Sequence, residues 1–579
     1  MSGFCGFTGS KYDVIQKMSA KIAHRGPGGE DFFVTDAISL GSRRLSASGL
    51  AQNGQLTIVF NGTIYNLPAD SQAESLLALY AEHGADMLNM LRGMFAFVIY
   101  DHVDNSIFAA RDHFGIKPFY YGIFDGELMF ASEIKALTEH PAFVKQINLD
   151  ALAAYMSFQY SVLDETFFKG VCKLPPAHYM RYADGQVTTN RYWQAEFEPV
   201  KMPLEEIVNK IDGAIAESIS AHLAGDEEIG SFLSSGVDSS LLAARFGGKK
   251  TFTVGFEHEG YNEIDYAREL AADKDFENHS KLITPEEYWQ ALPKIQYHMD
   301  EPLADPAAVA LYFASQTAKD HVKRVFSGEG VDELFGGYNI YKEPLSLRPM
   351  RILPKFIRRF LASMAAKLPN FKGKNFLARA ALDVEERFIG NAKIFSEDEK
   401  QAVLKVSGPK PQDITRPYYD KAQHYDDITK MQYLDLHLWA VGDILLKADK
   451  MTMAHSLEVR SPYMDKEVFA MATAIPTKYK VNKKATKYAF RLAAARYLAP
   501  KWAEKRKLGF PVPIRVWLRQ ENYYNAVKTA FESEAARQFF HADALVSLLD
   551  AHKAGKADNS RKIWTVYMFL LWYGEFFGA

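Results

Sequence analysis

The chain has 579 residues, which is too long for a single hydrophobic core, so its length predicts two to four domains. Its content of 48% hydrophobic and 24% charged residues is that of an ordinary folded, soluble protein. The formal net charge of −3 gives no electrostatic reason to expect a nucleic acid or an anionic membrane as partner, and the basic clusters at residues 348–359 and 501–507 are interpreted as solvated helix faces.

The cysteines and histidines provide no metal or disulfide framework. Cys5 and Cys172 are the only cysteines and match no zinc spacing, and the sixteen histidines form no ligand-spaced cluster. No apolar run reaches the roughly 18 residues that span a bilayer, and the first residues lack a basic stretch followed by an apolar core. We therefore predict a cytoplasmic protein without a transition metal and without a membrane or nucleic-acid partner.

Short β-branched and aromatic runs, broken by Gly, Asn and Asp, fill the first third of the chain, with one helical pattern at residues 73–83. This pattern predicts an α+β sandwich. The main blocks, in order, are MSGFCGFTGS (1–10), AHRGPGGED (23–31), GSRRLS (41–46), VFNGTIYN (59–66), LRGMFAFVIYD (91–101) and ARDHFGIKPFYY (110–121).

In this order the blocks resemble the glutaminase half of asparagine synthetases, a class II glutamine amidotransferase domain with the N-terminal-nucleophile fold. The family nucleophile is a Cys at position 2, but here Ser2 stands at that position and Cys5 at a variable one. A hydroxyl is a weaker nucleophile than a thiol with a pKa near about 8.5, so Ser2 is a doubtful catalyst. Cys5 could replace it only after loss of four residues, and the ungapped match of Gly3 and Gly6 disfavours that alternative.

The resemblance carries over unevenly to the rest of the glutamine pocket. It implies that Arg44 clamps the substrate carboxylate and that Asn61 and Gly62 form the oxyanion hole. However, Thr63 stands where the family has the Glu that binds the glutamine ammonium group.

A second acidic position of the family corresponds to Gln72, although the segment before it is short and Asp70 could instead supply that acid. The family motif HRGPD also lacks its acid here, because Gly28 stands in its last place. We therefore predict that residues 1–195 form an amidotransferase-like domain that is folded but weak or inactive toward glutamine.

After a predicted hairpin at 168–191 and a linker at 196–202, helical and strand patterns alternate, as in a parallel α/β sheet whose ligands bind at the carboxyl ends of the strands. The expected helices are 204–222, 238–246, 263–274, 286–299 and 307–320, and the expected strands lie around 229–233 and at 251–256, 280–283 and 322–326. The segment from about 344 onward is predicted to be rich in helices, including 428–447 and 562–577, with its tryptophans in the core.

Residues 231–240, SFLSSGVDSS, predict a phosphate cradle at a strand-to-helix turn. Its small and hydroxyl residues allow close approach of an anion, while Asp238 would repel bare phosphate and therefore argues for a bridging Mg2+. The stretch is not a Walker A loop, because GxxxxGK[ST] does not occur. A Ser-rich turn with a helix cap is the alternative for this stretch alone.

Two further strand ends carry candidate chemistry. Val254 could hold an adenine by main-chain contacts, and residues 327–338, SGEGVDELFGGY, place Glu329, Asp332 and Glu333 among glycines. An acidic surface loop is the alternative for the second of these stretches.

Together, SSGVDSS and SGEGVDE resemble the synthetase half of asparagine synthetases, an ATP pyrophosphatase domain assigned here to residues 203–579. The similarity extends to the blocks at 300–313, 449–465, 483–491 and 505–513. It implies ATP binding by Leu233, Ser234, Ser235, Gly236, Asp238, Ser239, Val254, Ser327 and Gly328. It also implies Mg2+ ligation by Asp238 and Asp332, a catalytic role for Lys487, and deprotonation of the attacking amine by Glu329. Without the resemblance, Lys487 would be read as an exposed helix lysine.

The implied activity is that of an ATP-dependent amide ligase. A carboxylate, most simply aspartate, attacks ATP to give an acyl-adenylate and pyrophosphate, and ammonia, free or from glutamine, then displaces AMP. Two competing hypotheses are a relative that acts on another carboxylate, such as a cell-wall precursor or a ring-closing substrate, and a non-catalytic nucleotide-binding paralogue. The oligomeric state stays open, a homodimer included.

Overall fold

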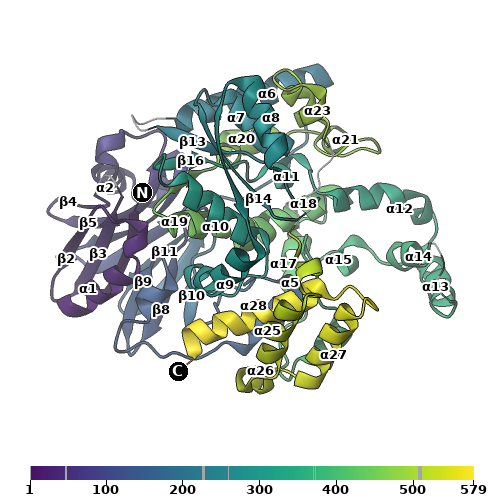
Figure 1. Cartoon of the computed structure of the whole chain (residues 1–579). Helices are drawn as coiled ribbons and strands as arrows, with labels where there is room; N and C mark the ends of the chain where they lie inside the picture. The colour runs from purple at the N-terminus through teal and green to yellow at the C-terminus, as the bar shows by residue number, and fades with distance from the viewer. Residues whose placement is uncertain are drawn as a thin grey trace.

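The computed structural model describes residues 2–45, 48–223, 228–258, 260–369, 371, 373–505 and 512–578, with only the backbone of Ser2 included. Two bodies of different architecture follow one another along the chain: a sandwich of sheets at the N-terminal end, and a parallel sheet surrounded by helices (Figure 1). None of the described helices is long and apolar enough to cross a membrane.

The N-terminal body is a sandwich of two six-stranded antiparallel sheets. One sheet has the order β10 (Val171–Lys173), β8 (Tyr120–Phe124), β9 (Glu127–Ala131), β1 (Ser2–Thr8), β3 (Ile38–Arg44), β2 (Glu30–Val34). The other has the order β12 (Gln186–Arg191), β11 (His178–Ala183), β7 (Ser106–Arg111), β6 (Gly93–Asp101), β5 (Leu56–Ile64), β4 (Leu50–Gln52). The predicted hairpin is confirmed, because β11 and β12 pair antiparallel.

Alternating side chains place apolar residues on both faces of each sheet. Phe4 and Leu40 of one sheet meet Val59 and Val98 of the other in the central core. Outside this core, α1 (Tyr12–Lys21) covers the first sheet and α2 (Gln72–His83) covers the second. The layers are therefore helix, sheet, sheet, helix, which confirms the predicted α+β sandwich.

The second body is built on a five-stranded parallel sheet. Its order is β15 (Glu277–Ile283), β14 (Lys250–Phe256), β13 (Ile229–Phe232), β16 (Arg324–Phe326), β17 (Glu458–Arg460). Helix α6 (Leu204–His222) precedes the sheet in the chain, and the helices that follow its strands up to residue 335 are α7 (Val237–Arg245), α8 (Ile264–Lys274), α9 (Pro285–Met299), α10 (Ala307–Ala318) and α11 (Val331–Phe335). The predicted parallel sheet is confirmed, and β17 is an additional short strand that the sequence patterns did not indicate.

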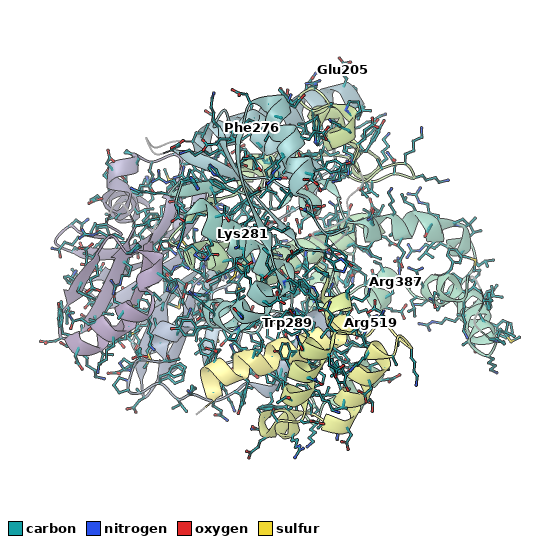
Figure 2. All side chains as sticks on the ribbon, viewed as in Figure 1. Glu205, Phe276, Lys281, Trp289, Arg387 and Arg519 are labelled. Atoms are coloured by element: carbon teal, nitrogen blue, oxygen red, sulfur yellow. The ribbon has the colours of Figure 1, made fainter. Side chains whose placement is uncertain are left out.

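Helices make up most of the rest of the chain. Those used below are α12 (Glu343–Arg351), α13 (Lys355–Ala366), α14 (Lys374–Ala380), α18 (Asp427–His437), α19 (Leu446–Met453), α22 (Tyr488–Ala494), α25 (Glu521–Phe531) and α28 (Ser560–Phe577). Trp564 and Trp572 of α28 are fully buried, as predicted. Trp289 of α9, labelled in Figure 2, stacks on Tyr523 of α25 with ring centroids 4.6 Å apart, so the C-terminal helices pack against the helices of the sheet.

The stretch at 428–447 is rich in helix, as predicted, and it also contains a π-helical segment. Between α18 and α19 lies a π-helical segment at Ala440–Leu445, labelled η5. A π segment inserts extra residues per turn and so redirects the side chains that follow it. Asp443 and Lys447 here form an ion pair of 2.9 Å.

A buried network of charges joins the two bodies. Arg25 Nη1 lies 2.8 Å from Asp449 Oδ2 and 2.9 Å from Glu133 Oε1, and Lys117 Nζ lies 2.9 Å from Asp449 Oδ1. The network continues through Lys135, Asp300 and Lys450, all buried. Burial alone would raise the pKa of Asp449, but the charges of Arg25 and Lys117 hold that pKa at about 2. These ion pairs therefore persist at neutral pH.

Replacing Asp449 by asparagine should destabilise the protein by roughly 3–5 kcal/mol, because Arg25 and Lys117 would stay buried with one fewer anionic partner. The shift of the urea unfolding midpoint measures this effect. Asp275→Asn is the control, since Asp275 pairs with Lys249 at 3.3 Å on the surface, where such pairs contribute about 0–1 kcal/mol. Equal shifts for the two variants would contradict a stabilising role of the network.

Candidate active site

A cavity of about 730 Å³ lies at the carboxyl ends of β13, β14 and β16. All the synthetase-half residues singled out in the sequence line it: Leu233, Ser234, Ser235, Gly236, Asp238, Ser239, Val254, Ser327, Gly328, Glu329, Asp332 and Lys487. They come from segments up to 254 positions apart, and the parallel sheet brings the strand ends to one edge. The structure therefore brings the predicted site residues together.

The cradle between β13 and α7 is closed by its own hydroxyl groups. The Ser234 N–H donates to Ser239 Oγ at 3.0 Å, and the Gly236 N–H donates to Ser234 Oγ at 3.1 Å. Ser235 is buried in the cavity wall and donates to Glu263, from its hydroxyl at 2.6 Å and its N–H at 3.4 Å. The cradle is thus held in place by its own hydrogen bonds, and the donors of Ser235 bind a carboxylate.

Lys487 lies between the two candidate metal-binding carboxylates. Its Nζ is 2.5 Å from Asp238 Oδ2 and 2.7 Å from Asp332 Oδ1, and the residue is only 1% exposed. It is not the exposed helix lysine of the alternative reading, because it precedes α22 in a left-handed conformation with φ of 55°. A Cβ on Gly337 would lie 1.8 Å from Asp332 Oδ1 and 2.0 Å from Lys487 Cε, so this close approach requires glycine.

The two carboxylates suit a cation that also binds phosphate. Asp238 Oδ1 is buried, and no hydrogen-bond donor among the described residues reaches it. No group of three or more His, Cys, Asp or Glu side chains in the described part of the chain forms a complete metal cage. Mg2+ is usually held by one or two carboxylates together with substrate phosphates and water. Asp238 and Asp332 therefore suit a Mg2+ ion shared with phosphates better than a metal held by protein ligands alone.

Two of the loop carboxylates have different surroundings. Glu329 lines the cavity, with Oε1 3.5 Å from Ser327 Oγ. Glu333 is 1% exposed and accepts a hydrogen bond of 2.5 Å from the Tyr338 hydroxyl, which in turn accepts one of 2.9 Å from Trp439 Nε1. Glu333 is therefore part of the wall of the cavity. Trp439, expected in the core, is buried and also lines the cavity.

The sequence analysis missed a group of charged side chains, two of which, Asp305 and Lys447, line the cavity. Lys447 Nζ lies 2.5 Å from Asp305 Oδ2 and 2.9 Å from Asp443 Oδ1. Burial raises the pKa of Asp443, whereas Lys447 more than offsets burial at Asp305 and lowers its pKa. The signal was available in the sequence, because Asp305 and Lys447 stand alone in otherwise apolar stretches, LADPAAVA and ILLKA.

Further cations missed by the sequence analysis also line the cavity: Arg491, Lys505, Arg515 and Arg561. With Lys447 and Lys487 they make six cationic side chains in the lining, which are matched in number by its carboxylates, Asp238, Glu263, Asp305, Glu329, Asp332 and Glu333.

The two candidate nucleophiles of the N-terminal body, Ser2 and Cys5, both lie on β1. Ser2 begins β1 opposite Arg44, and its side chain lies outside the described residues. Cys5 is fully buried among Ile15 and Met18 under α1, and burial raises the pKa of its thiol far above the ordinary range. Cys5 is therefore neither exposed nor ionised at neutral pH.

The residues predicted to form the oxyanion hole, Asn61 and Gly62, lie on β5, and the predicted clamp residue Arg44 ends β3. Both amide atoms of Asn61 are buried without a partner among the described residues. Gly62 has φ of +152°, and a Cβ there would lie 2.1 Å from the Met94 carbonyl oxygen, so only glycine fits. Arg44 lies along Gly29, and its Nη1 is 3.6 Å from Asp31 Oδ1.

Thr63 and Gln72, the two positions predicted to stand in place of family acids, make other contacts. Thr63 Oγ1 donates to Glu458 Oε1 of the second body at 3.3 Å. The Gln72 amide donates to the Ile64 carbonyl at 2.9 Å and accepts from the Ile64 N–H at 3.0 Å, which ties α2 to β5. Asp70, the possible substitute, is exposed.

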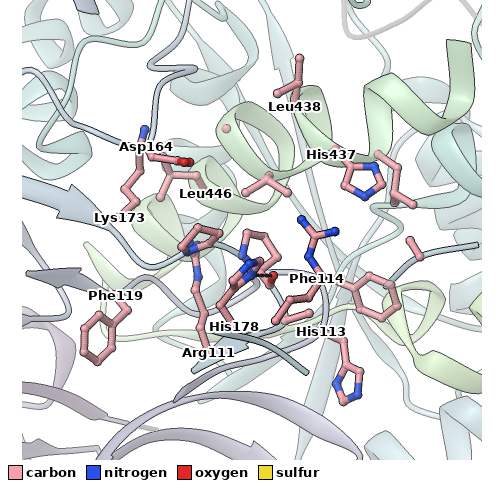
Figure 3. Close-up of a pocket in the computed structure, with 18 of the residues that line it drawn as sticks. Arg111, His113, Phe114, Phe119, Asp164, Lys173, His178, His437, Leu438 and Leu446 are labelled. Atoms are coloured by element: carbon pink, nitrogen blue, oxygen red, sulfur yellow. Dashed lines mark hydrogen bonds between the residues drawn. The ribbon is translucent and has the colours of Figure 1, made fainter. Parts of the chain in front are cut away.

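A second, smaller cavity of about 110 Å³ lies between the two bodies (Figure 3). Arg111 lines it, but its guanidinium already donates to the carbonyls of Gly115, Lys117 and Leu174 at 2.7–2.8 Å. Burial lowers the pKa of His437 in its wall to about 4, so this imidazole is neutral at pH 7. At about 110 Å³ against about 730 Å³, and with none of the cradle residues in its wall, this cavity is less suited to a nucleotide than the larger one.

Comparison with known proteins finds a matching family model for each of the two bodies. Residues 210–574 match the family model "Asparagine synthase", and residues 1–193 match "Glutamine amidotransferase domain". Asparagine synthetase [glutamine-hydrolyzing] 1 of Bacillus subtilis is 42% identical over 99% of this chain and 96% of its own length. Asparagine synthetase [glutamine-hydrolyzing] 3 of the same organism is 25% identical over 88% of this chain and 87% of its own. Among solved structures, a glutamine phosphoribosylpyrophosphate amidotransferase of B. subtilis has a TM-score of 0.26 at 13% identity, covering 48% of this chain and 65% of its own, too distant to bear on the site.

Proposed function

We propose that this chain, which belongs to the asparagine synthase family, activates aspartate as an acyl-adenylate and transfers ammonia to it. The products are asparagine, AMP and pyrophosphate. The observation that carries the proposal is the cluster in the larger cavity, where Lys487 bridges Asp238 and Asp332 beside the Ser-rich cradle. A non-catalytic paralogue would have no need to bury a lysine between two carboxylates.

In the first step the substrate carboxylate attacks the α-phosphate of ATP, and the bond to pyrophosphate breaks. The cradle N–H groups and hydroxyls bind phosphate oxygens, and Lys487 supplies a positive charge where negative charge develops. Asp238 and Asp332 would hold Mg2+, which neutralises phosphate charge when bound. Lys447, held by Asp305, adds a second fixed cation at the cavity wall.

In the second step ammonia attacks the acyl carbon and AMP leaves. Ammonium has no lone pair, so a base must remove its proton. Glu329 lines the cavity beside Ser327, while the Glu333 carboxylate is held in the wall by a 2.5 Å hydrogen bond from Tyr338, which supports Glu329 as that base.

For the N-terminal body we propose a weak or inactive glutaminase. Thr63 and Gln72 provide no carboxylate for an ammonium group, and their polar atoms already bond to Glu458 and Ile64. Free ammonia is then the main nitrogen donor.

ATP–pyrophosphate exchange, measured separately with a panel of carboxylates, tests the activation step. We expect aspartate to support exchange at least about tenfold better than glutamate, because one extra methylene misplaces the reacting carboxylate. Exchange only with a larger carboxylate would show that another acceptor is the substrate. No exchange with any carboxylate, in a preparation that binds ATP, would contradict the ligase proposal.

A further inference from the structure

Helices α12, α13 and α14 form a lobe that projects away from both sheets (Figure 1). Within the lobe α13 packs on α14, and Arg358 donates to the Ala380 carbonyl at 2.7 Å. Arg387, labelled in Figure 2, lies at the base of the lobe and contacts Glu343 at 2.8 Å. The face of α13 opposite α14 is therefore open to solvent.

That open face carries an apolar stripe. Phe356, Phe360 and Met364 are 72%, 63% and 53% exposed, and their spacing of four residues places them on one side of the helix. Ile352 before the helix and Leu368 after it are 85% and 55% exposed and extend the stripe. Single exposed apolar residues are ordinary, but a continuous row of five marks an interaction surface.

The stripe lies in a strongly basic segment. Between Glu343 and Asp383 the sequence contains nine Lys and Arg residues and no Asp or Glu. Five of these nine cations pair with acids outside the segment: Arg351 with Asp427, Lys355 with Asp383 at 2.6 Å, Arg358 with Asp383 at 3.5 Å, Arg359 with Glu386 at 2.8 Å and Arg379 with Glu343 at 3.3 Å. These acids neutralise only part of the charge, and the exposed Lys367 stands one turn beyond Met364 on the stripe's own face.

From these observations we propose that the stripe of α13 binds an anionic lipid surface. A helix with an apolar face and flanking cations lies in the membrane interface, with its apolar side chains inserted and its cations at the headgroups. Interpreting residues 348–359 as a solvated helix face explains the cations but not the exposed phenylalanines. A second copy is a poorer partner, because two equally basic lobes would repel each other. This inference does not rest on the proposed enzymatic function.

Co-sedimentation of the full chain with vesicles tests the proposal. We expect binding to vesicles of equal parts phosphatidylcholine and phosphatidylglycerol, little binding to phosphatidylcholine alone, and a decrease with added salt. Replacing Phe356, Phe360 and Met364 by serine should weaken binding at least about tenfold, since three inserted groups are lost. Lys367→Gln should weaken it by roughly fivefold, the effect of one cation near an anionic surface.

A matched control replaces Val103, Val144 and Val200, which are 75%, 60% and 51% exposed elsewhere, by serine and should leave binding unchanged. The variants alter exposed side chains, so their melting temperatures and ATP–pyrophosphate exchange should equal those of the parent. Equal binding to neutral and anionic vesicles, or unchanged binding of the stripe variant, would overturn the proposal. A dimer of the parent chain that the stripe variant converts to monomer, without any vesicle binding, would also overturn it and assign the stripe to a contact between copies.

Discussion

Replacing Lys487 by alanine should lower the rate of ATP–pyrophosphate exchange by about a hundredfold or more, the usual effect of removing a fixed charge from a transition state. Lys487 is buried, and its Nζ lies within 2.7 Å of both Asp238 and Asp332. Its loss removes the positive charge and leaves two carboxylates facing each other. Exchange with saturating ATP and aspartate, assayed at increasing Mg2+, measures the effect on the activation step alone.

Two further variants locate the cause of the loss. Lys483→Ala removes an exposed lysine from the same segment and should retain the parent rate. Asp238→Asn should abolish exchange with little effect on the fold, because an amide does not replace a carboxylate on Mg2+. If Lys487→Ala retained a rate within a few-fold of the parent, Lys487 would have only a structural role.

The sequence was sufficient to predict the sheets and the cradle because their patterns are local. A buried strand, small residues and a helix start follow one another between Ile229 and Arg245, and the structure has β13 and α7 there. Lys487, which pairs with Asp238 of the cradle, was predictable only through family resemblance. It lies 249 positions from Asp238, and no local pattern distinguishes Lys487 from other lysines.

Features that depend on tertiary packing were not predictable. Lys447 pairs with Asp305 directly after a π-helical segment, and the helix-rich pattern at 428–447 indicated neither that segment nor the pairing. The Thr63 contact with Glu458 and the Arg25 contact with Asp449 join residues about 400 positions apart across the two bodies. The block at 505–513, used for the resemblance, lies largely outside the described residues.

The last prediction concerns the nitrogen donor. With the parent chain, ammonium salts should support asparagine formation at least about tenfold better than glutamine, because the hydroxyl of Ser2 replaces a thiolate and the ammonium-binding acids are missing. The ammonium-dependent rate should rise with pH, since deprotonation of ammonium supplies the nucleophile. Asparagine and glutamate are measured together, so that hydrolysis of glutamine is distinguished from synthesis.

Variants at the N-terminus separate the nucleophile from its pocket. Ser2→Cys should restore glutaminase activity only in part, because Gln72 remains bonded to Ile64 and Thr63 faces the carboxylate of Glu458. That same carboxylate, held by Arg460, would repel a glutamate introduced at position 63, so the pocket cannot be repaired by one substitution. Cys5→Ala is the control and should change neither donor's rate, since the Cys5 thiol is buried and un-ionised. Glutamine-dependent synthesis by the parent chain at the ammonium rate, with one glutamate released per asparagine, would show that Ser2 or another group is an efficient nucleophile and would overturn the inactive-glutaminase proposal.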